Sequence, residues 1–122
     1  MDKSKCESLI KKHLVKMMRE LDINWSIRWK CSALSDCDAQ INKESNYFDA
    51  LITVDHEQIE DEDYLKKTLR HELLHTFTCE IDLLADQIQS VVSEKEYEIL
   101  KKTIEHCDEM IVLRIERLLD SL

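Results

Sequence analysis

Two histidines and a glutamate lie close together in the run His71-Glu72-Leu73-Leu74-His75, which has the pattern HExxH. On a helix, residues four apart lie on one face, one turn apart. Both imidazoles can therefore reach one tetrahedral Zn²⁺ at about 2.0–2.1 Å. Glu72 lies beside them, where it can take a proton from a water that the metal activates. The spacing predicts zinc ligands at His71 and His75 and a general base at Glu72.

A helix from Tyr64 to about residue 80 is expected to position this motif. Its apolar residues recur at helical spacing, at Leu65, Leu69, Leu73, Leu74 and Phe77. Burial of an unpaired imidazole or carboxylate is costly, so we expect the two histidines to face a cleft while the leucines pack. The alternative is that the histidines and Glu72 lie on an ordinary solvated face.

The segments before this helix predict one helix and three strands. Residues 4–21 have helical apolar spacing, and residues 24–31 alternate strictly between apolar and polar side chains. Two further strands are predicted near 38–43 and 47–54, with residues 44–46 as the turn of a hairpin. The last strand should present Phe48, Ala50, Ile52 and Val54 on one face. An acidic connector, residues 55–63, leads to the motif helix.

Two helices are predicted after the motif, near 81–92 and 94–120. Ser93 and Glu96 have the spacing of a capping box at the start of the last helix. One apolar stripe follows that helix, through Tyr97, Leu100, Ile104, Cys107, Ile111, Ile115, Leu118 and Leu122. Strands that precede a run of helices favour an α+β fold, and 122 residues fit a single domain spanning 1–122.

Residues 68–77 resemble the extended signature of the zincin metallopeptidases. The whole layout is similar to a minimal gluzincin, as in small metallopeptidases of bacteriophage genomes, with a leading helix, a tryptophan-containing strand, a hairpin, an HELLH helix and a long final helix. The resemblance implies zinc-dependent hydrolysis of peptide bonds. It also implies that the strand before the motif helix, residues 47–54, is a sheet edge that binds extended substrate.

The resemblance implies a third zinc ligand, a glutamate on the final helix. Glu109 is the first candidate because the stretch 109–115 matches the expected pattern of glutamate, branched residues and a basic residue. Asp108 lies nearer the centre of the apolar stripe, and Glu105 lies one turn before Glu109, so both stay open. A peptidase also needs a group that stabilises the oxyanion, for which the candidates are His106, Tyr97, Tyr47 and Arg114.

The composition excludes several other functions. The chain has no glycine, which argues against phosphate-binding loops, and its net charge of −9 disfavours nucleic acid as a partner. Its five cysteines include no CxxC pair, which is typical of free thiols in a reducing compartment. No apolar run is long enough to span a membrane. We therefore expect a soluble cytoplasmic protein, located in the host cytoplasm if a phage encodes it.

Three functional hypotheses remain. The first is a zinc metallopeptidase that acts on a peptide or protein substrate. The second is a catalytically weak or inactive zincin-like zinc protein that binds a host or phage protein. The third is a carboxylate-bridged di-iron site, since Glu72 and His75 also form an ExxH pair; such sites need two of these pairs, and the chain has one.

Overall fold

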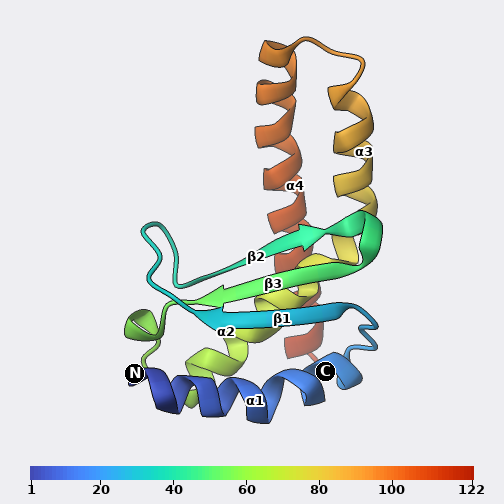
Figure 1. Cartoon of the computed structure of the whole chain (residues 1–122). Helices are drawn as coiled ribbons and strands as arrows, with labels where there is room; N and C mark the ends of the chain where they lie inside the picture. The colour runs from blue at the N-terminus through green and yellow to red at the C-terminus, as the bar shows by residue number, and fades with distance from the viewer. The chain divides into compact units, whose positions relative to one another are not determined.

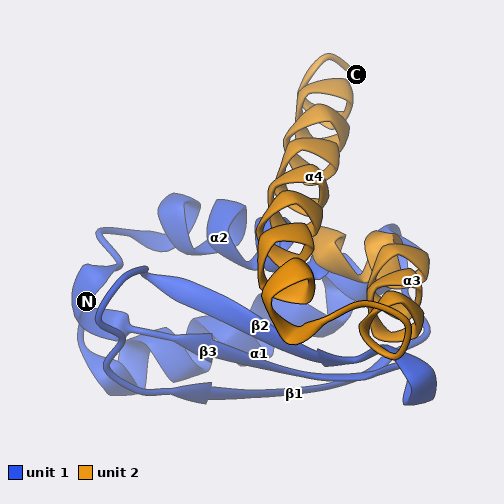
Figure 2. Cartoon of the chain, turned by 90° about the horizontal axis from the view of Figure 1, so that it is seen from above, with its two compact units in different colours: residues 1–73 blue, residues 74–122 orange.

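The computed structural model describes residues 1–122 and has the predicted mixed α+β architecture. Figure 1 labels its main elements, which are α1 (Lys3–Glu20), β1 (Ser26–Cys31), β2 (Ala39–Glu44), β3 (Asp49–Val54), α2 (Glu62–Leu74), α3 (Cys79–Gln89) and α4 (Glu94–Asp120). The chain forms two compact units, residues 1–73 and residues 74–122, which Figure 2 colours separately. None of the helices combines the length and apolarity that crossing a membrane requires.

The sheet of the first unit has the strand order β1-β3-β2. β3 pairs antiparallel with β2, which confirms the predicted hairpin, and it pairs parallel with β1. The expectation that residues 47–54 form a sheet edge is therefore wrong. β3 is the most buried of the three strands, and a strand rich in buried apolar residues is favoured at the centre of a sheet. The two edge strands carry alternating exposed residues, as edges usually do.

One face of this sheet forms the core of the first unit. The register places Trp29 opposite Ile52 and Cys31 opposite Val54, while Ile41 lies opposite Ile52 from the other side. These side chains pack with buried residues of both helices, which are Cys6, Ile10 and Leu14 of α1 and Leu65, Leu69 and Leu73 of α2. Because α2 packs its Leu65, Leu69 and Leu73 side chains into this core, that face of the helix is not available for a metal site.

The turn before β3 departs from the predicted pattern. Phe48 has a φ of 51°, in the left-handed region, and it is 55% exposed rather than turned inward with Ala50 and Ile52. Its ring meets the Trp25 ring edge-on, with centroids 5.7 Å apart. A left-handed residue closes the 3-10 turn Ser45–Tyr47, a position that glycine usually fills, and the chain has no glycine.

The second unit contains α3 and α4, which lie side by side as an antiparallel helical hairpin (Figure 1). The predicted capping box at Ser93 and Glu96 is confirmed. The buried stripe of α4 is rotated from its predicted position: Cys107 is exposed, whereas Val112 is fully buried. An α-helix has 3.6 residues per turn, so a stripe followed over many turns drifts around the helix axis.

Candidate metal centre

The motif lies where the backbone changes its helical form. α2 ends at Leu74, and a 3-10 turn, His75–Thr78, follows it. The prediction of one continuous helix to about residue 80 is therefore wrong at its end. The Thr78 hydroxyl donates a hydrogen bond to the His75 carbonyl oxygen at 2.8 Å. Such local side-chain bonds compete with the regular helical ladder, which accounts for the tighter turn at this point.

Two carboxylates of α4 contact the two ring nitrogens of His75. The Nδ1 atom lies 2.9 Å from Asp108 Oδ1, and the Nε2 atom lies 3.2 Å from Glu109 Oε2. The Thr78 hydroxyl oxygen also lies 2.6 Å from Asp108 Oδ1, so its single proton is shared between this carboxylate and the His75 carbonyl oxygen. The His75 and Asp108 side chains are only 12% and 14% exposed, whereas Glu109 is 47% exposed. Asp108 is thus fixed in place, while the Glu109 carboxylate is accessible from solvent.

This arrangement defines the direction in which His75 offers a lone pair. An Nδ1–H group that donates to Asp108 leaves the Nε2 lone pair facing the Glu109 carboxylate. Two lone pairs at 3.2 Å repel each other unless a proton or a cation lies between them. In known zinc sites, a carboxylate on the second nitrogen of a ligating histidine fixes the ring in this way. The contacts of His75 therefore suit a metal ligand.

His71, His75 and Glu109 form a group that could hold a metal ion, which we call the ligand group. Each residue offers one ligand atom, and the three atoms lie within 4.8 Å of one another. His71 belongs to the last turn of α2, one turn before His75. Of the other carboxylates considered, Asp108 contacts the opposite nitrogen of His75, and Glu105 is exposed and outside the group.

Glu72 is a buried residue, 8% exposed. Together with His71 it lines a shallow cavity of about 240 Å³, which we call the α2 cavity. The other lining residues are Asp38, Tyr64, Lys67 and Thr68. Sequence reasoning missed this cavity, although Tyr64, Thr68 and Glu72 are spaced four apart, which is the sign of one shared helix face. Asp38 comes from the loop before β2 and has no comparable signal.

The four oxyanion candidates are surface or partly exposed residues. Tyr47 is 79% exposed, and His106 and Arg114 are exposed on α4. Neither they nor Tyr97 belong to the ligand group or line the α2 cavity. The role predicted for them stays a prediction.

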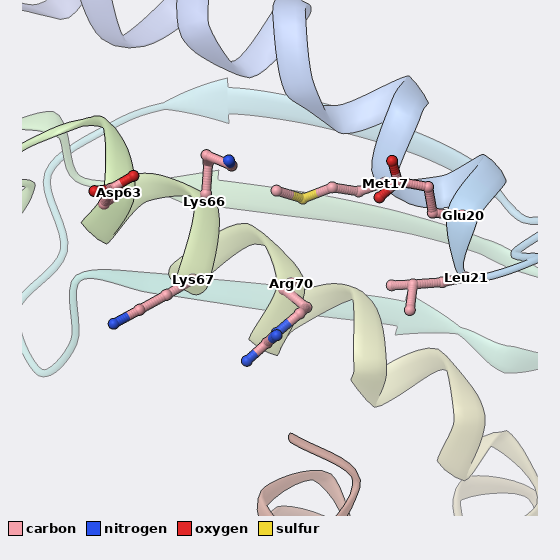
Figure 3. Close-up of a pocket in the computed structure, with 7 residues that line it drawn as sticks. All are labelled: Met17, Glu20, Leu21, Asp63, Lys66, Lys67 and Arg70. Atoms are coloured by element: carbon pink, nitrogen blue, oxygen red, sulfur yellow. The ribbon is translucent and has the colours of Figure 1, made fainter. Parts of the chain in front are cut away.

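A second cavity of the first unit, of about 350 Å³, lies between the end of α1 and α2 (Figure 3). Met17 and Glu20 of α1, with Leu21 directly after it, form one wall. The other wall is formed by α2 residues, which are Asp63, Lys66, Lys67 and Arg70. No residue of the HExxH motif lines this cavity, which shares only Lys67 with the α2 cavity.

The chain matches no protein-family model, no curated protein and no solved structure. Its resemblance to zincins therefore depends on residues 68–77 and on the order of its elements.

Proposed function

We propose that this chain is a zinc-dependent metallopeptidase of the minimal gluzincin type, which hydrolyses peptide bonds with a zinc-activated water. The observation that carries the proposal is the ligand group, in which donor atoms of His71, His75 and Glu109 lie within 4.8 Å of one another. The HExxH spacing and the similarity of the element order to small gluzincins support the same assignment.

The donor chemistry of the ligand group fits zinc. Two imidazole nitrogens and one carboxylate oxygen are a known protein ligand set of catalytic zinc, which keeps a further position for water or substrate. Sites for magnesium or calcium consist mainly of oxygen ligands. Asp108 supports the fit because it holds the Nδ1 side of His75 at 2.9 Å. Zinc bound in this group would acidify a water and polarise the substrate carbonyl.

Glu72 is the general base in this proposal. Glu72 follows His71 in the chain, and both residues line the α2 cavity. Its carboxylate would accept a proton from the attacking water and then donate that proton to the nitrogen of the leaving amine. Glu72 as a whole residue is 8% exposed, so bulk solvent would compete little for this proton.

A second candidate function is a zincin-like zinc protein with weak or no turnover, which serves as a binding module for a host or phage protein. The size of the α2 cavity favours it, because about 240 Å³ is below the range of roughly 300–1,000 Å³ that is usual for ligand sites. The two candidates share the same metal centre and differ in whether Glu72 moves a proton.

Metal analysis tests the shared centre. We expect about one zinc per purified wild-type chain and a melting temperature that falls when a chelator is added, because bound metal stabilises the folded state. His75→Ala and Glu109→Ala should lose zinc, whereas Glu105→Ala, one turn earlier on α4, should retain it. A wild-type chain that binds no zinc and is insensitive to chelator would exclude both candidates.

The Glu72→Gln variant separates the two candidates. It should retain zinc and lower kcat by about 10²–10⁴-fold on a cleavable peptide, which is the usual contribution of a general base. Unchanged turnover in this variant would contradict the role of Glu72. Zinc-loaded wild-type protein that cleaves no member of a broad peptide library would leave the binding module as the function.

A further inference from the structure

The α2 cavity continues the motif face of α2 toward the start of that helix. His71 and Glu72 line one part of it, and Tyr64 and Thr68 extend the same face by two turns. A substrate bond held beside Glu72 would therefore have a neighbouring side chain within reach of this space. At about 240 Å³ the cavity has the scale of a single amino-acid side chain rather than of a larger ligand.

Asp38 and Glu72 are the carboxylate acceptors that line the cavity. The Tyr64 hydroxyl donates to Asp38 Oδ2, and the Thr68 hydroxyl donates to the Tyr64 carbonyl oxygen at 2.9 Å. The bond to Asp38 raises the pKa of Tyr64, so the phenol remains a neutral donor that orients the carboxylate. An ionised carboxylate has about four acceptor sites, so Asp38 can accept further hydrogen bonds from a bound cation.

The charges around the cavity are mainly negative. Asp38 and Glu72 line the cavity itself. Burial raises the pKa of the Cys37 thiol, and the negative charges of Glu72, Asp38 and Asp36 raise it further. The negative charge of Glu60 also raises the pKa of Tyr64. Lys67 is the only cation that lines the cavity. A cationic side chain would thus meet more attraction here than an anionic one.

We propose that the α2 cavity binds a lysine or arginine side chain of the substrate, in a residue next to the scissile bond, and that Asp38 determines this preference. The inference rests on the proposed peptidase function for the position of the scissile bond. The carboxylate of Asp38, oriented by Tyr64, accepts charge-assisted hydrogen bonds from the ammonium or guanidinium group. Lys67 lines the same space, and its positive charge would oppose the entry of a second cation.

Peptides that differ at one position provide the test. Zinc-loaded protein is given matched fluorogenic peptides with arginine, norleucine or glutamate at each position flanking the cleaved bond. We expect kcat/KM to be roughly tenfold higher for arginine than for norleucine at one of these positions, because hydrogen bonds between charged groups are the stronger class. Asp38→Asn, which can still accept from Tyr64, should reduce this ratio to near one. Asp63→Asn is the matched control, because it removes an equal charge from the cavity of Figure 3 and should leave the ratio unchanged.

A binding measurement makes the inference independent of turnover. Fluorescence anisotropy with the zinc-loaded Glu72→Gln variant should show tighter binding of the arginine peptide than of the norleucine peptide, and Asp38→Asn should abolish the difference. Equal affinity for both peptides, or a preference that survives Asp38→Asn, overturns the assignment of the cavity. Arginine-selective binding without hydrolysis by the wild-type protein overturns the peptidase function alone. Zinc-dependent hydrolysis without any preference for a basic residue overturns the cavity assignment alone.

Discussion

Asp108 lies outside the ligand group, but its contact with His75 suits it to orient the His75 ring. Asp108 holds His75 Nδ1 at 2.9 Å and is itself held by Thr78. We expect Asp108→Asn to weaken zinc binding by about 10–100-fold, the usual effect of losing such a supporting carboxylate. Competition with a zinc-binding dye would measure it. The control is Glu105→Gln, an equal change of charge at an exposed position of α4. Equal affinities for both variants would show that Asp108 has only a packing role.

For single residues, the sequence predicted only those groupings that follow from spacing along one helix. His71, Glu72 and His75 are related by the helical repeat alone, so their grouping was predictable. Asp108 and Glu109 are neighbours about 100° apart on α4, and the choice between them depends on how that helix is rotated about its axis. That rotation follows from packing, which also moved the buried stripe toward Val112. Asp38 comes from a loop, where no periodicity shows which residues lie nearby.

Among the elements, α1 and α2 are linked by a polar contact that helps to hold the motif helix in place. Glu62 Oε1, in the first turn of α2, lies 2.6 Å from His13 Nε2 and 3.3 Å from Lys12 Nζ of α1. The hydrogen bond from His13, followed by that from Lys12, lowers the pKa of the Glu62 carboxyl.

This lowered pKa predicts how stability depends on pH. A carboxyl whose folded-state pKa is lowered stabilises the folded state above its unfolded value, ordinarily 4.5, and loses that contribution as the pH falls through the folded value. The free energy of unfolding should therefore decline less steeply below about pH 4.5 in Glu62→Gln than in the wild type. Urea unfolding across this range measures it, with the exposed Asp61→Asn as a control. Parallel pH profiles for wild type and Glu62→Gln would contradict the contact.

For the whole molecule, the five cysteines are free thiols in very different surroundings. Cys107 is exposed, whereas Cys6 is buried, and burial, followed by the neighbouring Cys31, raises the pKa of Cys6 to about 12. Because the thiolate is the reactive form, alkylation of the native protein should label Cys107 first and Cys6 last. Mass spectrometry of timed samples measures the order. Unfolding without a reductant should then expose five reactive thiols, and a smaller number would reveal a disulfide.

For the whole chain, the sequence predicted the order of the helices and strands better than their arrangement in space. The order of helices and strands followed from periodicity, and the Ser93 capping box was visible as a local pattern. The central place of β3 was not predictable, because the order of strands in a sheet depends on long-range pairing between segments, which the periodicity of each strand does not show. The division into residues 1–73 and 74–122 was not visible either, since it falls within the motif segment and no linker composition marks it.

The central position of β3 has a consequence for how the chain folds during its synthesis on the ribosome. Every ladder of the sheet includes β3, and β1 and β2 are not neighbours. The complete sheet therefore cannot form until Val54 has left the exit tunnel of the ribosome. β1 stays unpaired while β2 is being synthesised, because its only partner strand is β3. α1, which needs only local hydrogen bonds, can form during that delay and offer its apolar face to Trp25, Ile27 and Trp29. Slow codons placed soon after the β3 segment would lengthen the time available for this assembly before the motif helix emerges.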